Sequence, residues 1–404
     1  MKIVFLTFYY PPDLSAGSFR AVTLVTALFK KISSEDELHV ITTHPNRYPS
    51  HKVVAEDIET EENITIHRIK VPTHQSGMTS QAFTFTVFSW HALRCCIHLK
   101  PDFIIGSTSR LMTGVLTWFS SIVVNRRYFI DLRDIFSETI SDLLLLKSRL
   151  LSWFSKRVFS FIERRLLQKA AGVNVVSEGF LDYFQIQGMD TSKWSFFSHG
   201  VDREFIDVDL KSVVKQPDIK TVLYAGNIGS GQGLELIVPE VALQLGSSFR
   251  FQIVGDGSTR KLLGERLARL GVENVELLLP VGRELLIQYY KQADILFLHL
   301  NDVPAFKRVL PSKIFEYAAF GKPIVAGLGG YSAKFIEENV EHSCLFNPGD
   351  VDGCVECVQS AVTLYVKPSD VDRFVEKFSR EQIMEKMADH VLSIASPSIE
   401  SSGA

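Results

Sequence analysis

The sequence predicts an α/β fold with two doubly wound parallel-sheet domains. The chain has 404 residues, 46% hydrophobic and 22% charged, which is a globular composition in a chain too long for one compact core. Short apolar strands alternate with helical segments in two series, and the charged stretch Arg203–Asp218 separates them. We expect Rossmann-like domains that face one another across a cleft, because open α/β sheets bind ligands at the carboxyl ends of their strands.

The first series forms a predicted N-terminal domain at residues 1–205. Its strands are short and apolar, as is typical of buried parallel sheets. We predict strands at Lys2–Phe8, Glu37–Thr43, Ile64–Val71, Asp102–Gly106, Tyr128–Leu132 and Val173–Val176. We predict helices at Arg20–Lys31 and Thr84–Leu99.

A linker at residues 206–219 leads to a predicted C-terminal domain at residues 220–375. Its predicted strands are Thr221–Ala225, Arg250–Val254, Val275–Leu279, Ile295–Leu298 and Pro323–Ala326. Its predicted helices are Leu234–Leu245, Arg260–Leu270, Glu284–Lys291 and Ile314–Phe320. A closing helical stretch spans Asp370–Leu392, and we expect residues 376–404 to pack back on the N-terminal domain.

Charge and cysteine content restrict the class of protein. The net charge of −3 carries no nucleic-acid signature, but residues 1–205 hold 23 Lys and Arg against 20 acidic residues, whereas the remainder is net acidic. Five cysteines in so long a chain do not resemble a secreted disulfide framework. The apolar start ends at Pro11-Pro12-Asp13 without a cleavage site, and no apolar run approaches the ~20 residues of a membrane span. We therefore expect a cytoplasmic protein.

A glycine-rich segment, Tyr224–Gly233, joins a predicted strand to a predicted helix. Its four glycines would let the backbone approach an anion, and the helix that follows would supply N–H donors. We interpret it as a phosphate site; the alternative is a flexible glycine turn. The spacing does not match a dinucleotide-binding loop. A second strand-turn segment, Val254-Gly255-Asp256-Gly257, is equally consistent with ordinary turn chemistry.

The third motif is Leu310–Val325, in which Ser312 is a candidate N-cap and Lys313 and Glu316 lie in the first helical turn. Lys313, at a helix N-terminus, would bind an anion, and the Glu316 carboxylate would accept hydrogen bonds from both ribose hydroxyls. The alternative is a capping box between Ser312 and Glu316 that needs no ligand.

The ordered set of these motifs resembles the retaining GT-B glycosyltransferases of family 4. It continues through Ala293-Asp294 and Gly321-Lys322-Pro323, and in the first half through Tyr9–Gly17 and His199–Asp202, so the resemblance spans nearly the whole chain. Among such enzymes it is most similar to bacterial O-antigen and capsule transferases of the N-acetylfucosamine type. The resemblance implies transfer, with retention, from a nucleotide diphosphate sugar, of UDP-N-acetylhexosamine type, to a glycan or polyprenyl-diphosphate-linked acceptor.

The resemblance also implies roles for particular residues. Glu316 matches the second glutamate of the family's E-x7-E motif, whereas Arg308 stands where the first is usual, and Gln232 replaces the usual loop lysine. Lys313 would then carry the charge that faces the diphosphate. Donor contacts are expected at Gly17, Asn227, Gly229, Gly231, Gln232, Gly255, Pro280, Val281, Ser312, Lys313 and Glu316, with the base near Pro280 and Val281. Reaction residues are expected at Glu316, Arg308, Lys313 and Asp134.

The segment Asp131-Leu132-Arg133-Asp134 ends a predicted strand of the first domain. Arg133 would face phosphate, and Asp131 or Asp134 an acceptor hydroxyl; the alternative is an internal Asp–Arg pair. We expect no metal or other cofactor. Asp350-Val351-Asp352 and a similar triplet at residues 207–209 lie in predicted loops, and Cys354 and Cys357 fit a buried helix face.

A basic segment, Leu143–Lys169, has the periodicity of an amphipathic helix. Phe154, Val158 and Phe161 share its apolar side, and seven Lys and Arg residues stand against Glu163 alone. We predict that it docks on the inner face of the cell membrane; the alternative is a core helix with a solvated basic face. For the whole chain, the alternatives to a transferase are a GT-B epimerase or phosphorylase and an inactive nucleotide-sugar-binding protein.

Overall fold

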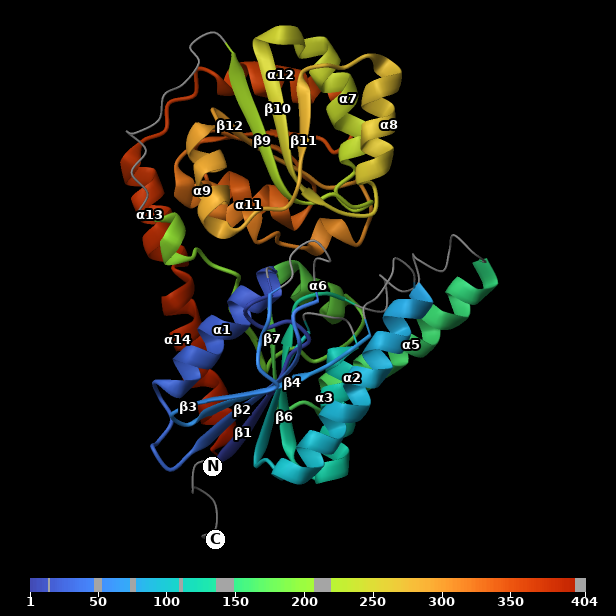
Figure 1. Cartoon of the computed structure of the whole chain (residues 1–404), viewed down its shortest axis with the longest axis vertical. Coiled ribbons are helices and arrows are strands. Elements are labelled where there is room, and N and C mark those ends of the chain that lie inside the picture. Colours follow the sequence, from blue (N-terminus) through green and yellow to red (C-terminus); the bar gives the residue numbers. More distant parts are fainter. Residues whose placement is uncertain are drawn as a thin grey trace. The chain divides into compact units, whose positions relative to one another are not determined.

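The computed structural model describes residues 1–13, 15–46, 53–72, 78–108, 112–135, 149–206 and 219–396. The chain divides into two compact units (Figure 1). Residues 1–199 and 380–404 form unit 1, and residues 200–379 form unit 2. Unit 2 is therefore inserted between the main body of unit 1 and its last helix. Most of the predicted linker, residues 207–218, lies outside the described residues, as do residues 143–148 of the predicted amphipathic segment.

Unit 1 contains an eight-stranded sheet in the order β3-β4-β2-β1-β5-β6-β7-β8. All neighbouring strands are parallel except β3, which runs antiparallel to β4. The strands are β1 (Lys2–Leu6), β2 (Glu37–Thr43), β3 (Ile58–Glu61), β4 (Ile64–Ile69), β5 (Phe103–Ser107), β6 (Arg127–Leu132), β7 (Gly172–Val175) and β8 (Trp194–Phe196).

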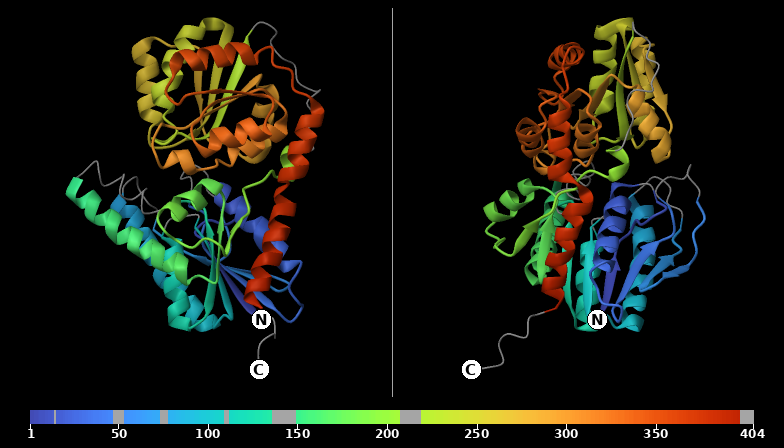
Figure 2. Two further views of the ribbon diagram at one scale, coloured as in Figure 1. Left: turned by 180° about the vertical axis from the view of Figure 1, so that it is seen from behind. Right: turned by 90° about the vertical axis from the view of Figure 1, so that its left-hand side faces the viewer.

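Helices cover both faces of this sheet. They are α1 (Ala16–Phe29), α2 (Met78–Leu99), α3 (Thr113–Val124), α5 (Arg149–Lys169), α6 (Glu178–Ile186) and α14 (Arg380–Ala395). On one face, α1 and α14 lie side by side and bury Leu24 and Met387 against Phe5 and Phe129 (Figures 1 and 2). Beside β5, α3 packs so closely that a Cβ atom on Gly106 would collide with Thr117, and α2 and α5 flank α3.

Unit 2 contains a six-stranded, fully parallel sheet in the order β11-β10-β9-β12-β13-β14. Its strands are β9 (Lys220–Asn227), β10 (Phe249–Asp256), β11 (Val275–Leu278), β12 (Ile295–His299), β13 (Ile324–Gly327) and β14 (Ser343–Phe346). Its α-helices are α7 (Leu234–Leu245), α8 (Arg260–Leu270), α9 (Arg283–Gln292), α10 (Lys313–Phe320), α11 (Tyr331–Asn339), α12 (Val351–Ala361) and α13 (Pro368–Phe378). Short 3₁₀ turns lie at η1 (Arg203–Phe205), η2 (Gly246–Ser248) and η3 (Phe306–Arg308).

The closing helical stretch, expected as one helix over Asp370–Leu392, is two helices instead. Ser379 interrupts it with an extended backbone (φ −56°, ψ 120°) and pairs with Val201 in a parallel bridge. The backbone N–H of Val201 donates to the carbonyl of Phe378 at 2.7 Å. A long-range strand-like contact therefore ends α13, and α14 returns to unit 1.

Candidate functional site

In unit 2, the ends of β9 and β10 meet through glycines. Gly226 and Gly255 are register partners, and both have a positive φ, near +150°. A Cβ atom on Gly255 would collide with the carbonyl oxygen of Gly226, and one on Gly257 with that of Ile228. Only glycine fits at these three positions, so the carboxyl ends of the two strands form a narrow backbone platform.

The ammonium group of Lys313 lies on this platform. A Cβ atom on Gly226 would collide with Lys313 Nζ, and the same Nζ lies 5.9 Å from the centre of the Tyr224 ring. Burial lowers the pKa of this ammonium, while the nearby carboxylate of Glu316 raises it. Lys313 is the first residue of α10, so its charge adds to the partial positive charge of a helix N-terminus.

Glu316 lies one helical turn after Lys313. It accepts a hydrogen bond from Tyr290 Oη at 3.1 Å, and burial together with this carboxylate raises the pKa of the Tyr290 phenol. Ser312 occupies the N-cap position but makes no side-chain capping bond. The capping-box explanation of Ser312 and Glu316 is therefore wrong, and the half-buried carboxylate is held in place by Tyr290 instead.

The glycine-rich segment after β9 is an ordered loop. Gln232 Oε1 accepts from Asn227 Nδ2 at 2.9 Å and from the backbone N–H of Gly229 at 3.3 Å. The Gln232 side chain therefore takes an amide that an anion would otherwise bind. Glu235 stands in the first turn of α7 and further lowers the affinity of that helix end for a phosphate. The positive charge that lies on the platform is the ammonium of Lys313.

Two residues of and after β12 fix the same loop from the other side. His299, fully buried, has Nδ1 2.7 Å from the carbonyl oxygen of Gln232, and its Nε2 accepts from the backbone N–H of Gly349 at 3.0 Å. Asn301 Nδ2 donates to the carbonyl of Ser230, and its backbone N–H donates to Gly231 at 2.9 Å. A Cβ atom on Gly231 would collide with the ring of Phe306.

The other predicted donor contacts of unit 2 lie near the same edge of the sheet. Pro280 and Val281 follow β11, which pairs with β10, and Val281 packs against the buried core. Arg308 ends the 3₁₀ turn η3 and is half-buried. The fold thus brings Gln232, Lys313 and Glu316 together at the carboxyl ends of β9, β10 and β12.

In unit 1, Asp131 does not face an acceptor. The fully buried guanidinium of Arg20 donates to both of its carboxylate oxygens at 2.9 Å, and Asn174 Nδ2 adds a third bond at 2.8 Å. Arg20 also donates to the carbonyl oxygens of Phe197 and Ser198. The expectation of an internal Asp–Arg pair is correct, but the partner is Arg20 on α1 and not the neighbouring Arg133.

Arg133 and Asp134 follow β6. The backbone N–H of Arg133 donates to Thr108 Oγ1 at 2.8 Å, and its buried Nε and Nη1 atoms have no hydrogen-bond partner among the described residues. Burial and the positive charges of Arg20 and Arg380 lower the pKa of Arg133 to about 10, against the opposing effect of Asp131. The same burial and these three arginines hold the pKa of His199 well below its usual value. Asp134 is exposed.

Gly17, one of the expected donor contacts, belongs to a helix. It lies in the first turn of α1, where Ser15 is the N-cap and accepts the backbone N–H of Ser18 at 3.1 Å. Asp13, just before the helix, accepts the backbone N–H of Asn46 through both carboxylate oxygens. The helix begins four residues earlier than predicted because Ser15 supplies the cap.

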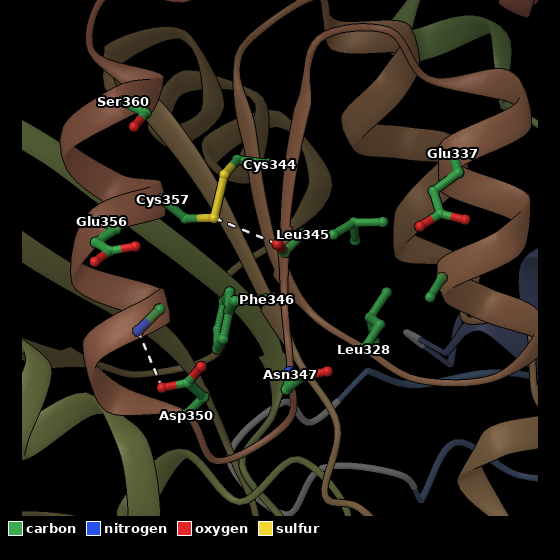
Figure 3. Close-up of a pocket in the computed structure, with 12 residues that line it drawn as sticks. Leu328, Glu337, Cys344, Leu345, Phe346, Asn347, Asp350, Glu356, Cys357 and Ser360 are labelled. Carbon is green, nitrogen blue, oxygen red and sulfur yellow. Dashed lines mark hydrogen bonds between the residues drawn. A yellow bond between two sulfur atoms is a disulfide. The ribbon is translucent and has the colours of Figure 1, made fainter.

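The acidic triplet and cysteines near the end of unit 2 have structural roles. Asp350 caps α12 by accepting the backbone N–H of Gly353 at 3.0 Å. Cys344 of β14 and Cys357 of α12 form a disulfide, which the sequence analysis did not predict. This disulfide lines a surface pocket of about 450 Å³ together with Phe346, Asp350 and other residues (Figure 3). Among the described residues, no three His, Cys, Asp or Glu side chains are grouped as metal ligands.

Sequence reasoning did not identify three residues of the site: His299, Asn301 and Tyr290. None belongs to a glycine-rich or charged motif, and each acts on a partner at least 26 positions away. The Gly329-Gly330 pair between β13 and α11 is the sequence feature that could have indicated a tight turn beside the site. At Gly330, with φ +62°, a Cβ atom would collide with the carbonyl of Lys307, so this turn packs directly against η3.

Known proteins similar to this chain agree with the two-unit architecture. A sulfoquinovosyl transferase of Arabidopsis thaliana is 25% identical over 79% of the chain, which spans 59% of that relative's length. The putative colanic acid biosynthesis glycosyl transferase WcaI of Escherichia coli is 23% identical over 70% of the chain and 71% of its own length. The Anabaena protein HepE, solved in complex with UDP-glucose, has a TM-score of 0.67 at 17% identity and covers 97% of this chain and 100% of its own.

Two family models match consecutive parts of the sequence. Residues 22–200 match the glycosyl transferase 4-like domain, and residues 219–380 match glycosyl transferases group 1. The first match covers strands β2 to β8 of unit 1, and the second covers all six strands of the unit 2 sheet; both units are doubly wound α/β structures. Together, the matches and the two parallel-sheet units identify the chain as a glycosyltransferase of the GT-B type.

Proposed function

We propose that this glycosyltransferase moves a sugar from a UDP-sugar, of the N-acetylhexosamine type, to a glycan or polyprenyl-diphosphate-linked acceptor with retention at the anomeric carbon. The observation that carries the proposal is the position of Lys313, whose ammonium lies on the Gly226 platform one helical turn from the Glu316 carboxylate. A cation and a carboxylate at that spacing fit a diphosphate and a ribose. HepE, which has this fold, was solved with UDP-glucose.

The proposed chemistry depends on the leaving group. The bond between the anomeric carbon and the diphosphate oxygen breaks while the acceptor hydroxyl forms a new bond on the same face. The acceptor proton passes to the departing diphosphate oxygen, so no protein nucleophile is needed. Lys313 and the N-terminus of α10 stabilise the developing negative charge, which is the main protein contribution. Arg308, on the turn that Gly330 supports, adds positive charge nearby.

The acceptor is proposed to bind unit 1 at the carboxyl ends of its strands. Arg133 and Asp134 follow β6 there, and α1 begins there with Gly17 in its first turn. Asp131 is excluded from this role because Arg20 and Asn174 saturate its carboxylate. Asp134 remains the carboxylate that would orient an acceptor hydroxyl.

The test is binding and turnover with a panel of UDP, GDP, ADP and dTDP sugars. UDP-sugars are expected to raise the melting temperature most, and Lys313→Met should abolish most of this shift, while Lys307→Met serves as the control. Lys307 is exposed and pairs with Asp302 at 2.9 Å. A wild-type response in Lys313→Met would overturn the assignment of the diphosphate site.

An inactive nucleotide-sugar binder is the second candidate, and one observation favours it. Gln232 replaces a loop lysine, and its side-chain oxygen accepts hydrogen bonds from the Asn227 amide and the Gly229 backbone N–H of the same loop. Such a protein would bind a UDP-sugar without releasing UDP in the presence of any acceptor. An epimerase would instead consume the donor without forming a glycosylated product.

The proposed setting is surface polysaccharide synthesis, as in O-antigen or capsule, on the cytoplasmic face of the membrane. The relative WcaI is a putative colanic acid biosynthesis glycosyl transferase. No described helix is long and apolar enough to cross a bilayer. On α5, Trp153 and Phe161 are 58% and 60% exposed, which supports a membrane-facing helix over a core helix with a solvated basic face. We propose that residues 143–169 bring the enzyme to the membrane surface as a peripheral protein.

A further inference from the structure

Unit 1 contains a surface pocket that has no part in the candidate site. Its volume is about 640 Å³, and it lies between α3, α5 and the start of β6. Trp118, Ile122 and Phe161 form an apolar wall, and four cations surround it: Arg126, Arg127, Arg165 and Lys169. An apolar wall beside clustered positive charge is complementary to an amphipathic anion.

The four cations are held in place without acidic partners. Arg126 Nε donates to the carbonyl of Pro101 at 3.2 Å, and Arg127 Nη2 donates to that of Ala395 at 2.9 Å. The Arg165 guanidinium lies 5.3 Å from the centre of the Phe161 ring. Within the described part of the chain, no carboxylate forms an ion pair with any of the four, and all four are exposed. Their charges therefore remain available to a ligand.

Apolar side chains are also exposed on the helices around the pocket. The structure places α2, α3 and α5 in contact with one another in that order (Figure 1). Their outward sides expose large apolar residues, which a water-facing helix does not need. These residues are Phe83, Trp90 and Ile97 of α2, Phe119, Ile122 and Val123 of α3, and Trp153, Val158 and Phe161 of α5.

The pocket lies at the end of the sheet opposite to the candidate acceptor site. Arg127 is the first residue of β6, whereas Asp131 is near its carboxyl end. Lys169 and Asn125 mark the C-terminal ends of α5 and α3. A charged group bound here is separated from Arg133 and Asp134 by the length of β6. The pocket is thus a second site and not part of the acceptor site.

We infer that this pocket binds the phosphate headgroup of an anionic phospholipid at the surface of a bilayer. The headgroup would lie among Arg126, Arg127, Arg165 and Lys169, and the upper acyl chain against Trp118, Ile122 and Phe161. The exposed apolar residues of α2, α3 and α5 would enter the interfacial layer around it. The inference extends the membrane association in the proposed function and does not depend on the transfer reaction.

A simpler explanation of two of the cations is the helix dipole. Basic residues stabilise the C-terminal ends of helices, and both Arg126 and Lys169 lie at such ends. That explanation requires no apolar wall and no exposed aromatic residues, and it predicts no preference between lipids. A comparison of binding to anionic and neutral lipids therefore distinguishes the two explanations.

The experiment is co-sedimentation of the full chain with vesicles of phosphatidylcholine alone and with added phosphatidylglycerol. The test variant is Arg165→Gln with Lys169→Gln, and the control is Lys193→Gln with Lys386→Gln, which removes two exposed charges elsewhere in unit 1. Each basic residue near an anionic surface strengthens binding about fivefold, so we expect the test variant to bind phosphatidylglycerol vesicles on the order of 30-fold more weakly. The control should bind within about threefold of the wild type.

A second readout places the lipid in the pocket. Brominated phosphatidylglycerol should quench part of the tryptophan fluorescence, and that part should be smaller in Trp118→Phe. Glycerol 3-phosphate without a bilayer should not compete at equal phosphate concentration, which separates a lipid surface from a free phosphate. Equal sedimentation with both vesicle types, equal loss in test and control variants, or unchanged quenching in Trp118→Phe would overturn the inference. Because UDP-sugar binding is measured separately and should be unchanged in both variants, failure here and failure of the proposed function are distinguishable.

Discussion

The imidazole of His299 hydrogen-bonds the main chain of Gln232, with Nδ1 2.7 Å from the carbonyl oxygen. Because a carbonyl oxygen can only accept, Nδ1 carries the proton and Nε2 is left to accept from Gly349. One buried ring therefore fixes the glycine-rich loop to the turn before α12.

His299→Phe should loosen this loop. The Gln232 carbonyl and the Gly349 N–H would both lose their partner, and each unsatisfied buried group costs about 1–3 kcal/mol. We expect a lower melting temperature and at least about tenfold weaker UDP-sugar binding. Calorimetric titration with the best sugar of the panel measures this, with Phe297→Leu as a control for simple core damage. If binding falls equally in both variants, the hydrogen bonds have no specific role.

Acid should destabilise the protein below about pH 6.5, the pKa of an unperturbed histidine. Burial lowers the pKa of His299, and burial and three arginines lower that of His199. A lowered folded-state pKa means that the unfolded chain binds the proton first, so this stability is complete above about pH 6.5 and is lost as pH falls. Melting temperatures between pH 8 and 5 should decline, and less steeply in His199→Asn. A parallel decline in this variant would show that His199 does not contribute.

Glu316→Ala should weaken UDP-sugar binding and nearly abolish transfer. Loss of a charge-assisted hydrogen bond to ribose costs roughly 1.5–3 kcal/mol, or about 10- to 150-fold in affinity. Tyr290→Phe removes the hydrogen bond that Glu316 accepts but leaves the carboxylate, so its effect should be smaller. The comparison is made by titration with UDP and with uridine. Wild-type affinity in Glu316→Ala would exclude the ribose contact.

The Arg20–Asp131 pair should be essential to the stability of unit 1. Removing one member of a buried pair leaves the other charge unpaired and costs about 3–5 kcal/mol. Asp131→Leu should therefore be strongly destabilising, while Arg20→Met combined with Asp131→Leu should recover part of the loss. Urea unfolding of the two variants provides the measurement. A double variant less stable than Asp131→Leu would mean that Arg20 is needed for its bonds to the Phe197 and Ser198 carbonyls.

Transfer activity should persist in EDTA. The described residues contain no cluster of metal ligands, and Asp350 is occupied as the cap of α12. Lys313 and a helix N-terminus supply positive charge where other enzymes use a metal. Initial rates with and without EDTA, followed by addition of Mg²⁺ or Mn²⁺, test this. Complete loss on chelation with recovery on metal addition would contradict it.

Local signals predicted many elements of the fold well. The bounds of α7 and α8 agree with the prediction because a glycine ends each helix, Gly246 and Gly271, and their apolar residues recur at helical spacing. By contrast, α3 was not predicted. Its buried positions include small and hydroxyl residues such as Gly114, Thr117 and Ser120, while Phe119 and Ile122 are exposed, so it lacks the apolar buried stripe that marks an amphipathic helix. The antiparallel edge strand β3 was missed because its Glu-Thr-Glu sequence has little strand character.

Long-range contacts could not be predicted from local patterns. An internal Asp–Arg pair was one of two open interpretations of Asp131, but the partner, Arg20, is 111 positions away, whereas Arg133 is only two. Sequence distance says nothing about which side chains share the end of a sheet. The same limit applies to the Cys344–Cys357 disulfide, because five cysteines in a chain of 404 residues do not indicate which of them pair. For Lys313 and Glu316, helical spacing was enough to place both residues in one turn.

The bridge between Val201 and Ser379 has a consequence for how the protein can be divided. The chain enters and leaves unit 2 at neighbouring points. The backbone hydrogen bond from Val201 to Phe378 holds the two ends of the unit together. A fragment of residues 200–379 would keep that closure, whereas a fragment ending at residue 199 would lack α14 and expose the face of Leu24 and Phe129. Genetic separation of the two halves therefore requires excising the middle of the gene and rejoining its flanks, because a single stop codon leaves the first half without its final helix.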